Sequence, residues 1–213
     1  MRYGTRMAER TRARRSPTGS ERKRDAARTR ELILDAALVE FGEHGYAGAR
    51  TGAIAKRAGV NQQLISYYFG GKAGLYGAVQ QRWEGVAAPL RDLELPLSDV
   101  VANFVRVAAI QRSWGRMLAW GELTGDVGEP ERDTGTYFAG MVDELRARQQ
   151  RGQLAADLDP AYVQLAMFAV ALAPQMLPRI ARQLTGLDPE SPDFVQHYCD
   201  QVARIVERLA DGR

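Results

Sequence analysis

The side chains best suited to a chemical task lie between residues 61 and 69, where amides, a hydroxyl and phenols follow one another. In a helix, Ile65 and Phe69 are one turn apart and both face inward. The polar side chains then point outward, with Tyr68 on the flank. The outward set is Gln62, Gln63, Ser66 and Tyr67. Such a face suits base edges and phosphates in a DNA major groove.

A short preceding helix is expected to position this face. Thr51 is predicted to be its N-cap, because a hydroxyl can accept from a free backbone N–H. Gly59 can take the left-handed conformation that ends the helix. Asn61 can then cap the second helix. Together the segment from residue 51 to 72 predicts a helix-turn-helix.

Two further helices are expected around it. Before it, Ile33, Ala37 and Phe41 form one apolar stripe, and Gly45 is predicted to end that helix. After it, a helix from residue 71 to about 93 is predicted to connect the DNA-reading head to the core. Its N-terminus offers free amides, and Pro89 is expected to bend or end it.

Residues 28 to 83 resemble the tetracycline-repressor (TetR) family of one-component regulators. The matching elements are I–L–x–A–A, F–x–x–x–G–Y, T–x–x–x–I–A, A–G–V and Y–F–x–x–K, in this order. The resemblance implies a DNA-binding head with a helical ligand-binding and dimerisation core. It implies that Thr51 and Lys72 hold phosphates, and that Tyr67 and Tyr68 contact phosphates or sugars.

Gln62, Gln63 and Ser66 are then best placed to contact bases. Two positions depart from the family pattern. Ser66 stands where an aromatic residue is common, and Gly52 where a base-reading side chain can occur. Both departures place more weight on Gln62, on Gln63 and on DNA shape.

Composition agrees with this interpretation. Residues 1–93 hold 17 Lys and Arg against 9 Asp and Glu, whereas residues 94–213 hold 12 against 17. A basic half beside the helix-turn-helix is the pattern expected of a DNA-binding end. No apolar run approaches the roughly 18 residues of a membrane span, and no signal peptide is visible. We therefore expect a cytoplasmic protein without a membrane partner.

Three regions are predicted. Residues 1–22 form a basic tail that is expected to be disordered, and the tail either adds affinity for phosphate or is an inert extension. Residues 23–70 form the helix-turn-helix domain. Residues 71–213 contain the connecting helix and the effector-binding and dimerisation core. The pattern is all-α throughout.

The core begins with a predicted long helix from Ser98, as its cap, to about residue 122. Its apolar residues cover almost the whole circumference, which indicates burial on several sides. Bulky side chains there and in two later helices either pack an ordinary core or, as the resemblance implies, line a pocket for a small organic effector. The pocket candidates are Phe104, Gln111, Trp114, Met117, Trp120, Phe138, Met141 and Phe168.

The last helices are predicted to form a homodimer. One stripe steps by four and three residues, which suits helix–helix packing, and a purely internal contact is the alternative. It consists of Val195, Cys199, Val202, Val206 and Leu209, broadened by Tyr198 and Ile205. The predicted partner helix contributes Tyr162, Leu165, Ala169 and Leu172. Cys199 is expected to be a small core residue.

The resulting hypothesis is a homodimeric repressor that a small, largely apolar effector releases from an inverted-repeat operator. A DNA-binding dimer controlled by a protein partner or by its own abundance remains open. An all-helical enzyme is a remote alternative, because His44 and His197 lie in no metal-binding or catalytic spacing. We expect no metal and no cofactor. The sequence does not identify the effector, the operator or the target genes.

Overall fold

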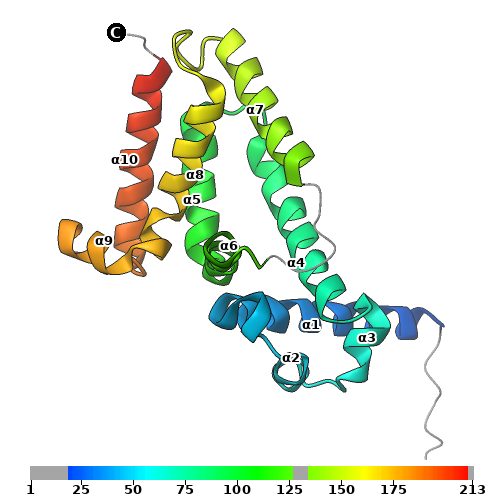
Figure 1. The fold of residues 1–213 in the computed structure, drawn as a ribbon. Helices are drawn as coiled ribbons and strands as arrows, with labels where there is room; N and C mark the ends of the chain where they lie inside the picture. The colour runs from blue at the N-terminus through cyan, green and yellow to red at the C-terminus, as the bar shows by residue number, and fades with distance from the viewer. Residues whose placement is uncertain (1–18, 127–133, 211–213) are drawn as a thin grey trace, which may run out of the picture.

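The computed structural model describes residues 19–126 and 134–210. Helices are the regular secondary structure of these ranges and no strand occurs in them, so the predicted all-α fold is confirmed there (Figure 1). The helices are α1 (Gly19–Gly48), α2 (Thr51–Ala58), α3 (Gln63–Phe69), α4 (Lys72–Ala87), the 3₁₀ helix η1 (Ala88–Arg91), α5 (Leu97–Ile110), α6 (Arg112–Thr124), α7 (Thr134–Gln150), α8 (Pro160–Met176), α9 (Pro178–Thr185) and α10 (Pro192–Ala210).

Helix α1 begins at Gly19, inside the segment predicted to be a disordered tail, so residues 19–22 are helical. The rest of the predicted tail, residues 1–18, lies outside the described residues. The predicted end at Gly45 corresponds to a kink, since Gly45 has φ 67° and one further turn follows it. Tyr46 then packs back on α1, with its ring 6.2 Å from that of Phe41.

The helix-turn-helix forms as expected except at its first cap. The prediction that Thr51 is the N-cap of α2 is wrong, because Arg50 holds the extended cap conformation and Thr51 is the first helical residue. Gly59 ends α2 in the left-handed conformation, with φ 68°. The Asn61 side chain accepts from the backbone N–H of Gln63 at 2.9 Å and so satisfies a free amide at the start of α3, although Gln62 holds the N-cap position itself.

Helix α4 rises from the head and continues into the core, where η1 contains Pro89. Helix α6 packs against α1 and crosses it, between the head and the rest of the core (Figure 1). Its Trp114 and Met117 belong to the same hydrophobic cluster as Phe41 and Ile54 of the head. The head is therefore packed against α6 as well as joined to α4.

The predicted single long helix from Ser98 is wrong, because two helices, α5 and α6, cover this segment. The backbone turns at Gln111, where φ is −95° and ψ is 48°. Ser98 lies inside the first turn and is buried, and Pro96 is the N-cap. A pattern that is apolar on all sides does not mark such a break, because the apolar residues continue through both helices. The expected burial on several sides is also incomplete, since Ile110 and Leu123 are 79% and 85% exposed.

The C-terminal helices follow the proline signals. Asp159 caps α8 by accepting from the backbone N–H of Ala161 at 2.8 Å. Pro174 lies within α8, whereas Pro178 starts α9 after a bend of 88°. Within the described ranges, no single helix is long and apolar enough to cross a membrane, and only the bent pair α8–α9 meets the criteria of length and composition together.

Candidate nucleic-acid interface and core cavity

The structure places the predicted base-contacting side chains on one exposed face of α3. Ile65 and Phe69 are buried beneath it, with exposed fractions of 1% and 9%. Gln62, just before α3, and Gln63 and Ser66 within it are exposed. An amide or hydroxyl presented this way can donate to and accept from base edges in a major groove. The geometry is therefore compatible with direct base contacts.

Gln62 is held in place by the preceding helix. Its Nε2 donates to Thr51 Oγ1 at 2.9 Å, so the threonine hydroxyl positions the glutamine. A Cβ on Gly52 would lie 3.4 Å from Gln62 Oε1, which is the close edge of ordinary contact. The Gln62 amide therefore lies beside Gly52 at the start of α2, at a distance that would still accommodate a Cβ.

The predicted phosphate contacts surround this face. Tyr67 is 79% exposed, and its ring meets that of half-buried Tyr68 edge-on at 5.0 Å. Lys72 begins α4, and its Nζ donates to the carbonyl of Ala47 at 3.1 Å. The same ammonium lies 4.7 Å from the centre of the Tyr46 ring. These contacts fix a positive charge beside the free amides of the α4 N-terminus, where an anion is stabilised.

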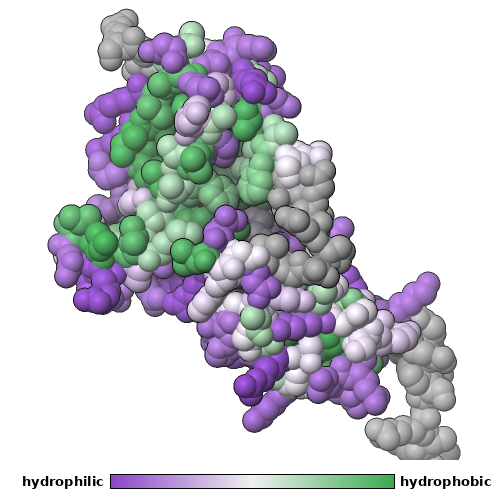
Figure 2. Space-filling model, viewed as in Figure 1, coloured by the Kyte–Doolittle hydropathy of each residue, from purple (hydrophilic) through white to green (hydrophobic). Residues whose placement is uncertain are grey.

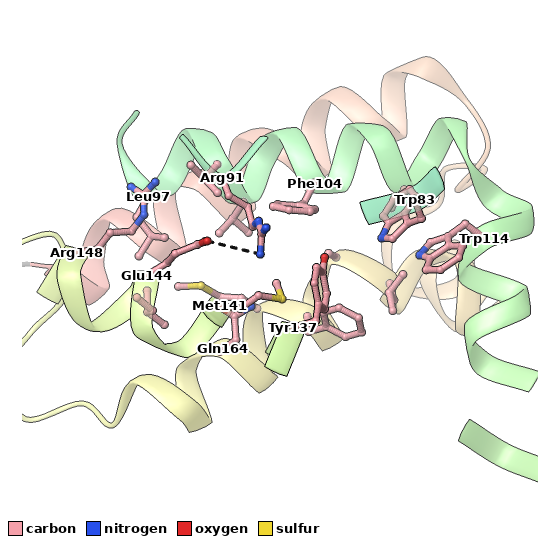
Figure 3. A pocket seen from close by; sticks show the side chains of 18 residues that line it. Trp83, Arg91, Leu97, Phe104, Trp114, Tyr137, Met141, Glu144, Arg148 and Gln164 are labelled. Carbon is pink, nitrogen blue, oxygen red and sulfur yellow. Dashed lines mark ion pairs between the residues drawn. The ribbon is translucent and has the colours of Figure 1, made fainter. Parts of the chain in front are cut away.

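A cavity lies between α4, α5, α7 and α8 (Figure 3). Its empty volume is about 810 Å³, part of which is open to solvent. Most of its lining is apolar, as is common in sites for small organic ligands. The lining residues are Trp83, Arg91, Leu97, Val100, Val101, Phe104, Ala108, Trp114, Tyr137, Met141, Glu144, Leu145, Arg148, Gln164, Met167, Phe168, Ala171 and Leu172.

Four of the predicted pocket residues line this cavity: Phe104, Trp114, Met141 and Phe168. The other four do not, which corrects the prediction. Gln111 lies at the break between α5 and α6, and Met117 is buried against the head. Trp120 packs over Gly45 at the kink of α1, where an added Cβ would lie 3.2 Å from its ring. Phe138 is 42% exposed and contacts Phe168 from outside the lining.

The polar side of the cavity was not predicted from the sequence. Arg91 Nη1 lies 3.6 Å from Glu144 Oε1, and its guanidinium carbon lies 5.2 Å from the centre of the Tyr137 ring. Burial raises the pKa of Tyr137, so its phenol stays protonated near neutral pH. Arg91 follows the connecting helix and Glu144 lies on α7. Their distance in sequence is why no local pattern predicted the pair.

Two tryptophans connect the cavity to the head. The rings of Trp83 on α4 and Trp114 on α6 are stacked, with centroids 4.8 Å apart and planes 14° apart. Both line one end of the cavity (Figure 3). Trp114 also belongs to the hydrophobic cluster of the head. A movement of the cavity wall can therefore be transmitted directly to α4 and, through α6, to α1.

Some residues predicted for the dimer interface are buried inside the protomer, whereas others are exposed. Cys199, Val202 and Val206 are buried within the protomer, where α10 packs on α5 and the Cys199 thiol faces the Ala102 carbonyl. Leu172 is buried as well. These four are therefore corrected to internal contacts, while Val195, Tyr198 and Leu209 are half-buried. The heptad spacing is satisfied by a neighbouring helix of the same chain.

The remaining predicted residues are exposed on a different face. They are Tyr162, Leu165 and Ala169 of α8 and Ile205 of α10. The face continues past the α8–α9 bend, and Figure 2 shows hydrophobic side chains gathered over these helices. We call it the α8–α10 face; its large exposed apolar residues are Tyr162, Leu165, Met176, Leu177, Ile180, Leu184 and Ile205.

Comparisons with known proteins match both halves of the chain. Residues 33–79 match the family described as bacterial regulatory proteins, tetR family. Residues 97–208 match a tetracyclin repressor-like C-terminal domain. The sequence is 33% identical over 196 residues to the transcriptional regulator Mb3439c of Mycobacterium bovis, covering 91% of this chain and 94% of that protein.

Two Streptomyces coelicolor proteins are also similar. The transcriptional repressor SCO4008 is 26% identical over 199 residues, covering 88% of this chain and 98% of the repressor. The crystal structure of SCO4942, a candidate transcriptional regulator, superposes with a TM-score of 0.67 at 27% identity, covering 84% of this chain and 97% of that one. These relatives are named as regulators and not as enzymes. The chain therefore belongs to the TetR family of DNA-binding transcriptional regulators.

Proposed function

We propose that this regulator is a homodimeric repressor that binds an inverted-repeat operator and releases it when a small organic molecule enters the core cavity. The observation that carries this proposal is a cavity whose wall contains Trp83 of the connecting helix α4 and Trp114 of α6, the helix that packs against the head. The same two helices position the DNA-reading head. A site of action in the cytoplasm, where operator DNA is accessible, follows from this proposal.

The α3 face supports operator binding. Gln62, Gln63 and Ser66 are assigned to bases, whereas Thr51, Tyr67, Tyr68 and Lys72 are assigned to the sugar–phosphate backbone. Two copies of this head can enter successive major grooves about 34–36 Å apart, which requires an inverted repeat. Repression follows when the occupied operator overlaps a promoter.

The α8–α10 face supports the homodimer. Half of the large exposed hydrophobic residues among the described residues, seven of fourteen, belong to it. Contiguous apolar surface of this kind marks an interaction site on a folded protein. A two-fold axis through the face would bring α8, α9 and α10 of each protomer together and set the distance between the two heads.

The cavity supports ligand response over control by abundance alone. Its lining is mostly apolar with a few polar side chains, as is common in sites for small organic molecules. A ligand that prefers a different head separation lowers DNA affinity, and operator DNA must lower ligand affinity by the same factor. The remote enzyme alternative has no support from the relatives.

A double charge substitution tests the dimer. Leu165→Glu with Ile205→Glu places carboxylates in the α8–α10 face, where the wild-type side chains are 67% and 57% exposed. We expect monomers in sedimentation velocity and a loss of operator affinity of at least about 100-fold, because the second head no longer binds as part of the same molecule. Ile110→Glu, at a residue near α1 that is 79% exposed and lies outside the α8–α10 face, is the control. A double variant that remains dimeric contradicts the assigned face.

A further inference from the structure

One hydrogen-bond donor in the cavity has no acceptor. Arg91 Nε is buried and has no hydrogen-bond partner among the residues that the structure describes. The same side chain meets Glu144 through Nη1 at 3.6 Å, which is longer than a hydrogen bond. Buried N–H groups are almost always paired in folded proteins. The guanidinium therefore has capacity for an acceptor that comes from outside the chain.

The second arginine of the cavity is already used. Arg148 donates to the backbone carbonyl of Leu95 at 2.6 Å, to the side chain of Gln153 at 2.8 Å and to the carbonyl of Asp92. These bonds tie α7 to the loop before α5. Arg148 is therefore a structural residue, and within the described part of the lining Arg91 is the remaining cation that can recognise a ligand.

The charge of the cavity lining favours the binding of an anionic ligand. Among the described residues that line the cavity, two are arginines and one is a glutamate, so this part of the lining carries net positive charge. Glu144 faces Arg91 near the middle of the cavity, while Phe104 lies beside the guanidinium and Met141 next to Glu144 (Figure 3). A carboxylate pairs with a guanidinium through two parallel N–H···O bonds, which a weakly engaged arginine can provide. The surrounding wall is apolar.

We propose that the cavity binds an amphipathic carboxylate, whose acid group accepts from Arg91 and whose hydrocarbon part lies among Phe104, Met141 and Phe168. This inference rests on the proposed ligand response and names the chemical class of the ligand. Arg91 ends η1, directly after α4, so the ligand acid contacts the chain at the core end of the connecting helix. Competition between the ligand and Glu144 for Arg91 then alters how η1 is held against α7.

Three probes with the same ten-carbon chain test the head group: decanoate, decanol and decyltrimethylammonium. Each is titrated into the full-length protein by isothermal titration calorimetry. We expect decanoate to bind most tightly and the cation to bind least. In Arg91→Met, decanoate affinity falls by about ten-fold or more while decanol affinity is unchanged, because only the charge-assisted bonds are lost. Arg146→Met, which removes an exposed arginine of α7 outside the lining, is the matched control.

A second variant moves the result in the opposite direction. Glu144→Gln removes the carboxylate that competes for Arg91, so decanoate affinity rises several-fold. A variant that merely disturbs the fold would not tighten binding, and thermal unfolding checks that each variant is folded. Tightest binding of the cation, or decanoate binding that is the same in Arg91→Met, overturns the carboxylate inference and leaves ligand response standing. No binding by any of the three probes overturns the inference and also removes support for the ligand-responsive function.

Discussion

Gly42 is a point of close approach between α1 of the DNA-reading head and α6 of the core. A Cβ at this position of α1 would lie 2.6 Å from the carbonyl oxygen of Ser113 and 3.0 Å from its Cα, both of which are backbone atoms of α6. Ordinary contact begins at 3.4 Å. In a Gly42→Ala variant, α6 must therefore retreat from α1 by about 0.8 Å in this region, since backbone cannot rotate away as a side chain can.

The expected cost can be isolated by a matched glycine. Overpacking of this kind costs about 1–3 kcal/mol, and alanine gains about 1 kcal/mol over glycine inside a helix. Gly77, inside α4, has no atom within 4 Å of a Cβ, so Gly77→Ala carries only the gain. The free energy of unfolding of Gly42→Ala should therefore be about 1–3 kcal/mol below that of Gly77→Ala.

Urea unfolding measures this difference, with both variants at the same protein concentration because dimers gain stability with concentration. The displaced residue Ser113 precedes Trp114, which lines the cavity and contacts the head. Operator affinity of the folded Gly42→Ala variant should therefore change as well. Equal stability of the two variants would refute the tight α1–α6 contact on which the coupling argument depends.

Two predictions concern the head. Lys72→Ala should weaken binding to all DNA sequences alike and make the slope of log affinity against log salt shallower by about one unit, because one phosphate contact is lost. Fluorescence anisotropy over a salt series checks this, and an unchanged slope would remove Lys72 from the phosphate contacts. Gln63→Ala should lower discrimination between the operator and single-base variants by about 1–3 kcal/mol. Competition binding measures that loss, and unaltered discrimination would assign base reading to Gln62, Ser66 or DNA shape.

Much of the head could be predicted from the sequence, because its signals are local. Gly59 and Asn61 act within a few residues of their own positions, and the buried pair Ile65 and Phe69 is one turn apart. The predicted N-cap of α2 was wrong by one residue, since Arg50 has the extended backbone conformation of the N-cap that was expected at Thr51. Thr51 instead binds Gln62, a partner that a local pattern does not reveal.

The core was harder to predict, because its signals depend on which helices meet. An apolar stripe on α10 can pack either against a second protomer or against α5 of the same chain. In the structure Cys199, Val202 and Val206 are buried within the protomer, where α10 packs on α5. Bulky apolar side chains likewise fill a core or line a cavity equally well. Arg91 and Glu144 escaped prediction because they meet only after α7 folds beside η1.

The central claim is that two heads read an inverted repeat as a dimer. Selection of genomic fragments by the purified full-length protein, at about 150 mM salt so that nonspecific phosphate binding is screened, tests it most directly. We expect enriched fragments that share one inverted repeat with half-sites about one helical turn apart. Binding without an enriched motif, or enrichment of a single half-site, would contradict it.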